Sequence, residues 1–194
     1  MRKSVLFFLA FCLVPFAATM CRAQDKIELF VGYSYVRGTA QVTPNTPLQP
    51  CPPNCGPVTQ HVNLSGWEFS ATYKLNRWFG PIADFSGHYG ELNGGTTHLQ
   101  TYLLGPQVSV PGRISPFAHV LFGVAHESVG PFNTPAFFSP GSDSALASTF
   151  GGGIDMKAAP FLSLRLIQAD YLRTRFFGHT QNQPRISAGL VLHF

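Results

Sequence analysis

Hydrophobic residues alternate with polar or small residues along most of the chain after residue 24. About eight such runs, each of roughly 10 to 15 residues, are bounded by turn-forming residues, and this region has no helical periodicity of any length. Alternation with a period of two predicts β-strands, and strands of this length suit a barrel that crosses a membrane. The predicted strands are 27–37, 62–75, 78–90, 97–110, 116–128, 146–157, 161–175 and 185–194.

The alternation assigns one face of most runs to lipid and the other to the interior. In residues 62–75, for example, Trp67 and Phe69 share the apolar face, whereas Glu68 and Ser70 share the polar one. A strand with one apolar and one polar face fits a sheet that separates two environments.

Two runs resist this assignment. In residues 97–110, Gly105-Pro106 interrupts the pattern and predicts a bulge or a bend, so we assign no faces there. In residues 161–175, the register that turns Tyr171 toward lipid also turns Arg165 toward lipid. We expect Arg165 to lie at the membrane interface, where a long cationic side chain can reach the head groups.

The predicted connections alternate between short and long. Those after the second, fourth and sixth runs hold only about two to four residues, whereas the others are generally longer, above all 38–61 and 129–145. Outer-membrane barrels show this asymmetry because their periplasmic turns are tight and their external loops are long. We therefore expect an all-β fold, an eight-stranded antiparallel up-and-down transmembrane β-barrel with both termini on the periplasmic side.

The first 23 residues have the layout of a secretory signal peptide. Arg2 and Lys3 precede an apolar stretch at 5–18, and Cys21-Arg22-Ala23 offers small residues at the two positions that a signal peptidase reads. The stretch is shorter than the roughly 20 residues that a membrane-spanning helix needs. We expect cleavage after Ala23, which leaves residues 24–194 as the barrel domain. An uncleaved anchor and a lipoprotein at Cys21 are the alternatives.

The net charge means less once the signal peptide is set aside. The whole chain has a formal charge of +4, from 13 Lys and Arg against 9 Asp and Glu. Removing Arg2, Lys3 and Arg22 leaves 13 − 3 = 10 basic side chains against 9 acidic ones. A chain so close to neutral gives no electrostatic case for nucleic acid as a partner.

Export also decides how the cysteines are interpreted. Cys12 and Cys21 would leave with the signal peptide, so that Cys51 and Cys55 remain, separated by Pro52-Pro53-Asn54. An oxidising periplasm favours a disulfide that closes this short loop. A metal site is the alternative, but two thiolates need two further ligands, and only His61 lies near them in the sequence.

Several charged or histidine side chains project into the predicted lumen. The interior of an eight-stranded barrel is just wide enough to be filled by side chains, so these groups must pair with one another. We expect a plugged lumen, with a proton or ion path as the alternative. The predicted polar network consists of Glu28, Glu68, Asp84, His88, His119, Asp155, Lys157 and Arg185.

The chain ends on an aromatic residue at the end of its last predicted strand. Ser187, Gly189, Leu192 and Phe194 follow the order polar, glycine, apolar, aromatic. This segment resembles the C-terminal signal by which the bacterial barrel-assembly machinery recognises its clients. Together with the alternating runs and stretches such as Phe30-Val31-Gly32-Tyr33-Ser34-Tyr35, it makes the mature chain similar to the small outer-membrane barrels of the OmpA/OmpX-like family.

That resemblance implies an architecture more than a role, because the family includes membrane anchors, adhesins and a few lipid-modifying enzymes. One motif invites comparison with the enzymes: His126-Glu127-Ser128 ends the fifth run, with His126 and Ser128 facing lipid. A His-x-Ser pair on the external wall is similar to that of lipid A deacylases, in which the His activates the Ser for attack on an ester. The match departs at Val129, where that family has Asn, and no acidic residue can be placed to orient the His.

We expect an integral protein of the bacterial outer membrane with a structural or adhesin-like role and without enzymatic activity, cofactor or metal. Its expected partners are outer-membrane lipid and lipopolysaccharide, the barrel-assembly machinery, and an extracellular ligand at the loops, where Phe132, Phe137 and Phe138 offer rings for stacking on carbohydrate. The alternatives are a lipid A deacylase-like esterase, a narrow porin-like channel, and a soluble periplasmic barrel that binds a small apolar ligand.

Overall fold

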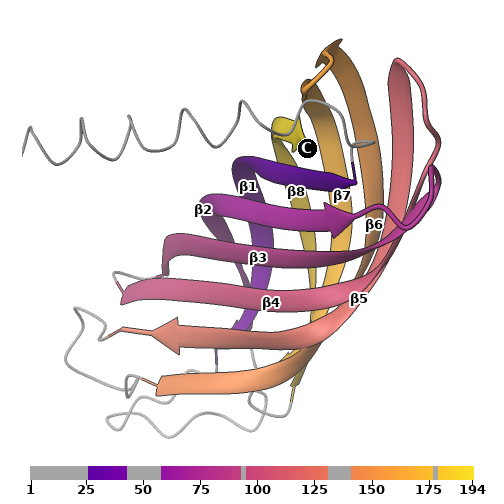
Figure 1. The fold of residues 1–194 in the computed structure, drawn as a ribbon. Helices are drawn as coiled ribbons and strands as arrows, with labels where there is room; N and C mark the ends of the chain where they lie inside the picture. Colours follow the sequence, from indigo (N-terminus) through magenta and orange to yellow (C-terminus); the bar gives the residue numbers. More distant parts are fainter. Residues whose placement is uncertain (1–25, 43–57, 93–94, 131–140, 177–178) are drawn as a thin grey trace, which may run out of the picture.

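A closed antiparallel barrel accounts for the described part of the chain, which in the computed structural model comprises residues 26–42, 58–92, 95–130, 141–176 and 179–194 (Figure 1). Each strand pairs with the next in chain order, and β1 pairs with β8. The predicted fold class is confirmed. The strands are β1 (Ile27–Val42), β2 (Val58–Tyr73), β3 (Phe79–Leu92), β4 (Gly95–Ser109), β5 (Ile114–Val129), β6 (Gly141–Ala159), β7 (Leu162–Phe176) and β8 (His179–His193).

None of the described residues belongs to a helix that is long and apolar enough to cross a membrane. The two ends of the barrel domain meet where β1 begins and β8 ends. The backbone N–H of Ile27 donates to the carbonyl oxygen of Phe194 at 3.0 Å, and the N–H of Phe194 donates to the carbonyl oxygen of Ile27 at 2.9 Å. The turns after β2, β4 and β6 lie at this same end of the barrel, as the antiparallel order requires.

The outer wall is apolar, as the alternation predicts. Along β2, Trp67, Phe69 and Tyr73 are exposed, whereas Glu68 and Ser70 between them are buried inside the barrel. The same division holds on the other strands. Large apolar side chains exposed on the outer wall include Val31, Tyr33, Phe85, Tyr102, Leu104, Val120, Phe122, Val124, Phe150, Ile154, Leu166, Ile167, Ile186 and Leu190.

Two connections are shorter than expected. Only residues 93–94 separate β3 from β4, and only residues 177–178 separate β7 from β8. The expectation of longer connections at both places was wrong because these strands continue past the ends of the alternating runs. The segments between β1 and β2 and between β5 and β6 are longer, as predicted.

At Gly105-Pro106 the predicted interruption is a gap in the pairing with β5, where neither residue has a partner, and not a bulge. Leu104 pairs with Phe122 and Gln107 with His119, so the register against β5 is the same on both sides of Gly105-Pro106. Pro106 lies on the exposed face opposite Pro81 of β3. Proline is unusual in a strand that pairs on both sides, because it has no N–H to donate to a neighbouring strand. The register of β4 is nevertheless the same before and after Pro106.

The bulge lies in β7 instead, and it corrects the placement of Arg165. Between Arg165 and Gln168, β7 holds one residue more than the facing segment of β8, and the register shifts there. Leu166 and Ile167 both point outward, with 48% and 46% of their surface exposed, and this restores Arg165 to the interior, where it is 3% exposed. The strict alternation used for the prediction therefore gave Arg165 the wrong face.

Several predictions fall outside the described residues and stay predictions. These are the signal peptide at 1–23, the Cys51–Cys55 disulfide, and the loop aromatics Phe132, Phe137 and Phe138.

We predict that β7 tolerates deletion of Leu166 but not deletion of Ala169. Without Leu166 the strand alternates regularly, and Arg165 still faces the interior. Ala169 is equally outward-facing but lies in a segment paired one to one with both neighbours, so its loss moves Gln168 out of the lumen or breaks the pairing. Folding is measured by gel electrophoresis of the detergent-folded protein, because a folded barrel that has not been boiled migrates faster than the boiled, unfolded chain. Equal failure of both deletions would contradict the assignment of the bulge.

Candidate functional site

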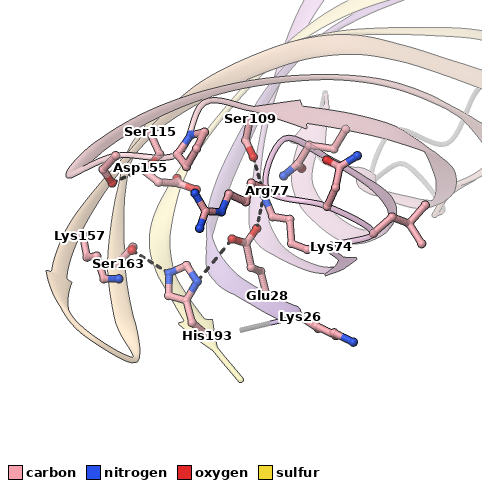
Figure 2. A pocket seen from close by; sticks show the side chains of 15 residues that line it. Lys26, Glu28, Lys74, Arg77, Ser109, Ser115, Asp155, Lys157, Ser163 and His193 are labelled. Carbon is pink, nitrogen blue, oxygen red and sulfur yellow. Dashed lines mark hydrogen bonds and ion pairs between the residues drawn. The ribbon is translucent and has the colours of Figure 1, made fainter. Parts of the chain in front are cut away.

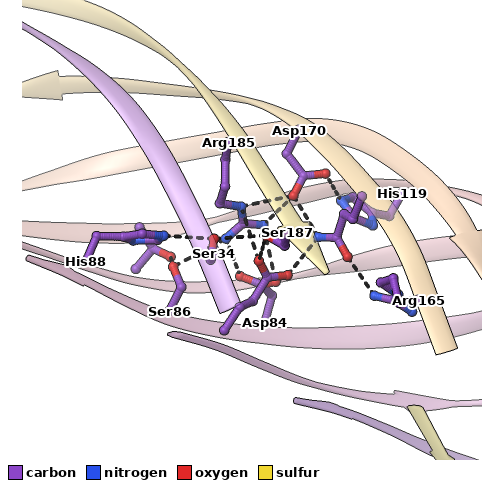
Figure 3. Close-up of polar contacts among 12 residues, drawn as sticks. Ser34, Asp84, Ser86, His88, His119, Arg165, Asp170, Arg185 and Ser187 are labelled. Carbon is purple, nitrogen blue, oxygen red and sulfur yellow. Dashed lines mark hydrogen bonds and ion pairs between the residues drawn. The ribbon is translucent and has the colours of Figure 1, made fainter. Parts of the chain in front are cut away.

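Arg185 of β8 lies at the centre of the barrel, among carboxylates from three other strands (Figure 3). Its guanidinium donates to Asp84 of β3 at 3.0 and 3.2 Å and to Asp170 of β7 at 2.7 and 3.0 Å. The Oε2 atom of Glu68 of β2 lies 3.7 Å from Nε. The four side chains are at most 1% exposed. Burial of these charges is tolerable only because they are paired.

Polar side chains complete the hydrogen bonding of two of these carboxylates. The amide of Gln168 donates to Glu68 and to Asp170, each at 2.7 Å. The hydroxyl of Ser187 donates to Glu68 at 2.5 Å, and His119 shares a hydrogen bond of 2.9 Å with Asp170. Hydrogen bonds to an ionised acceptor are stronger than those between neutral groups, so this shell stabilises the charged cluster.

A second buried arginine, Arg165 of β7, lies between two phenylalanine rings. It donates to both oxygens of Asp155, at 2.8 and 3.0 Å, and to Gln168 at 2.6 Å. Its guanidinium carbon lies 4.3 Å from the ring centre of Phe30 and 4.1 Å from that of Phe117. Aromatic faces attract a cation, and they do so more strongly where water is excluded. Gln168 thus links the Arg165 layer to the Arg185 cluster.

Glycines make room for the two rings. A Cβ atom on Gly153 would lie 2.8 Å from the ring of Phe117, and one on Gly32 would lie 2.6 Å from the ring of Phe30. Gly189, which pairs with Gly32 across the β1–β8 seam, would place a Cβ 3.0 Å from the ring of Phe30. At all three positions a Cβ atom would come closer still to a backbone carbonyl oxygen of the neighbouring strand, so a larger residue would disturb the strand pairing as well as the rings.

A polar hollow of about 520 Å³ opens at the end of the barrel that carries the termini (Figure 2). Lys74 forms an ion pair with Glu28 at 3.1 Å and donates to Ser109 at 2.5 Å. His193 lies 3.4 Å from Glu28 and shares a hydrogen bond of 2.8 Å with Ser163. The side chains of these ion pairs are mostly buried, with 13–18% of their surface exposed.

Buried apolar side chains fill much of the remaining interior. Most of them come from the strand halves that lie away from the termini, where they pack beside buried polar side chains such as Thr97, Thr174 and Gln183. The apolar side chains include Val36, Val62, Leu64, Leu99, Ala125, Ala147, Leu172 and Phe176.

The predicted polar residues fall into separate groups. Glu68, Asp84 and Arg185 meet at the centre, His119 joins them through Asp170, and His88 reaches Ser34 at 2.9 Å. Asp155 pairs with Arg165 instead. Glu28 and Lys157 line the open hollow rather than the buried cluster.

Asp170, Gln168 and the inward position of Arg165 were not among the predicted members of the polar network. All three lie on β7, where the bulge breaks the alternation. Two consecutive apolar residues, Leu166 and Ile167, were the available signal, because counting back from Phe176 in steps of two places Asp170 and Gln168 inside.

The predicted His126–Ser128 pair does not form the expected contact. His126 is exposed, and its Nδ1 shares a hydrogen bond of 2.8 Å with the hydroxyl of Ser144 on β6. Ser144 pairs with His126 across the β5–β6 ladder, whereas Ser128 lies two residues along its own strand. The described residues provide no acid or amide that hydrogen-bonds to Nε2 of His126, so the orienting third group of a catalytic triad is lacking there.

The C-terminal residues contribute to the barrel itself. Ser187 bonds to Glu68 and Ser34, Gly189 packs beneath Phe30, and Phe194 pairs with Ile27. Leu192 pairs with Leu29 in the closing seam. Among the described residues, no group of three or more His, Cys, Asp or Glu side chains is placed to hold a metal ion.

We predict that Arg185→Met lowers the free energy of unfolding by about 3–5 kcal/mol, because it leaves buried carboxylates without their counter-charge. Urea unfolding of protein folded into lipid vesicles measures the change. The exposed Arg37→Met on β1 serves as the control and should change stability little. Adding Asp84→Asn and Asp170→Asn to Arg185→Met should recover part of the loss. A loss below about 1 kcal/mol would show that the cluster is not held by Arg185.

Comparisons with solved structures identify proteins that have a similar fold. Neisserial surface protein A matches 87% of this chain and 97% of its own, with 11% identity and a TM-score of 0.64. The attachment invasion locus protein Ail of Yersinia pestis matches 88% of this chain and all of its own, with 14% identity and a TM-score of 0.54. No protein-family model and no curated protein matches the sequence.

These identities are low, so the comparisons speak for the fold alone. The apolar outer wall provides the independent evidence for location, because a soluble protein does not expose so continuous a band of large apolar side chains. The chain therefore has the fold of the small eight-stranded barrels of bacterial outer membranes, and its apolar outer wall is that of a barrel embedded in a lipid bilayer.

Proposed function

We propose that this protein is a closed outer-membrane barrel with a structural and adhesive role, in which the interior provides stability and the external segments make contact with other surfaces. The buried cluster around Arg185 is the observation that supports a closed lumen. Its charged side chains are at most 1% exposed, although they lie in the middle of the barrel. In a conducting channel, water would contact such charged side chains.

The layers on both sides of the cluster support the same proposal. On the side of the termini, Arg165 and its two phenylalanine rings separate the cluster from the open hollow. On the side of the loops, packed side chains that include Leu64, Leu172 and Phe176 are fully buried and fill the interior. An ion would have to cross both, so a narrow porin-like channel is the less favoured function.

We predict that the protein inserted into planar lipid bilayers produces no discrete current steps in molar potassium chloride. A 16-stranded porin reconstituted in the same membranes is the control for insertion and detection. The gel migration of the reconstituted sample, with and without boiling, shows that the barrel is folded. Reproducible current steps from folded protein would contradict the closed lumen.

The external segments suggest the chemistry of the contact. Residues 43–57 and 131–140, which join β1 to β2 and β5 to β6, contain no charged side chain but contain many prolines and, in the second segment, Phe132, Phe137 and Phe138. Ail has been crystallised with the heparin analogue sucrose octasulfate, a polyanion. Uncharged segments do not favour such a ligand, so we propose that this chain recognises an uncharged surface by stacking and apolar contact.

We predict that bacteria displaying this protein attach to cultured epithelial monolayers and that Phe132→Ala, Phe137→Ala and Phe138→Ala together reduce the attachment to the level of cells without the protein. Molar salt should leave the attachment unchanged, because no ion pairs are involved. Phe161→Ala, which changes an exposed aromatic in the β6–β7 turn, is the matched control. Loss of attachment in salt or on adding soluble heparin would contradict an uncharged ligand.

Two further partners are part of the proposal. The barrel-assembly machinery would recognise the segment that ends in Leu192 and Phe194, and outer-leaflet lipid would surround the apolar wall. An esterase role is not favoured, because Ser144 rather than Ser128 contacts His126 and no described group orients that histidine.

A further inference from the structure

A hollow of about 600 Å³ lies on the outer wall, across β5, β6 and β7. Its β5 and β6 side is apolar: Leu146 is 82% exposed and Phe122 is 62% exposed, and Val124 lies beside them. Its other side is basic and carries Arg173 and Arg175 of β7, with Thr174 between them and Thr180 of β8 beside them. The hollow therefore combines an apolar floor with two cationic side chains, a combination that suits a ligand with both acyl and anionic parts.

The position of the two arginines along β7 corresponds to the interface of the outer leaflet. The outward face of β7 carries Leu164, Ile167, Ala169 and Tyr171 in order from the end that bears the termini, and Arg173 and Arg175 follow. The ring of Tyr171 lies 5.2 Å from that of Phe150, so the cations begin just beyond an aromatic pair. Aromatic side chains mark the level of the head groups, and Arg173 and Arg175 lie on its external side.

The side chains of these arginines cannot turn inward. Thr174 between them is 1% exposed inside the barrel, so both arginines project from the outer wall. No carboxylate of the described residues forms an ion pair with either one, whereas the inward-facing Arg165 and Arg185 are both paired. At the level of the head groups, an anionic head group is the counter-charge available to two cations that have no partner in the protein.

We propose that this hollow binds the phosphorylated head group of an outer-leaflet glycolipid. Arg173 and Arg175, two residues apart on one face and therefore roughly 7 Å apart along the strand, contact its phosphate oxygens. Its acyl chains lie over Phe122, Val124 and Leu146. The site goes beyond the proposed adhesive role, because it lies on the barrel wall and involves neither of the long external segments.

Native mass spectrometry of the detergent-folded barrel, titrated with bisphosphorylated lipid A, tests the site. We expect Arg173→Ala with Arg175→Ala to weaken binding by about tenfold or more. Arg77→Ala with Arg113→Ala removes the same charge from the turns at the opposite end and should leave binding unchanged. Leu146→Asn should weaken binding of the hexa-acylated lipid and leave the migration of the folded barrel intact.

Two ligand controls separate the possible sources of affinity. Lipid A without its phosphates should bind like the double arginine variant, and phosphatidylglycerol, which has one phosphate and two chains, should bind at least tenfold more weakly than lipid A. Equal binding of phosphatidylglycerol and lipid A would overturn the assignment to a glycolipid. Equal loss in the two double variants would reduce the site to general charge attraction and overturn it as well. All variants are first shown to fold by their migration without boiling.

Discussion

Closure of β1 against β8 is the constraint on which the rest of the structure depends. Within a bilayer no water is available for an open strand edge, so every backbone donor and acceptor must find a partner in the protein. The register from Glu28–His193 to Val36–Arg185 provides this at the seam. Gly32 and Gly189 pair within it, and their lack of side chains allows Phe30 to lie inside the barrel next to the seam.

Closure with so few strands leaves a lumen that side chains must fill, and this determines how the charges are arranged. An isolated buried ion would cost more than the barrel could compensate, so each buried arginine is enclosed. Arg185 is surrounded by carboxylates, and Arg165 has one carboxylate and two aromatic faces. Gln168 connects the two, because an amide can donate to carboxylates and accept from a guanidinium at once.

Much of this could be predicted from the sequence, because a period of two determines which side chains share a face. Strand number, closure and the inward position of Glu68, Asp84 and Arg185 follow from it. Alternation fails where one extra residue shifts the count, as at Leu166 and Ile167, and it placed Arg165 on the wrong face. It also cannot identify partners across strands: His126 contacts Ser144, which is distant in sequence, and not the neighbouring Ser128.

The inward-facing and outward-facing arginines of the barrel wall differ in whether they have an acidic partner. Among the described residues, the arginines that face inward are all paired with carboxylates. These ion pairs connect the strands to one another across the interior. Such groups cannot bind an external ligand without disrupting the fold. Arg173 and Arg175 contribute nothing comparable to the interior, yet they lie where lipid head groups are found. With the lumen closed as we propose, recognition would involve the outer wall and the loops, and the unpaired charge on that wall is the place that we propose for it.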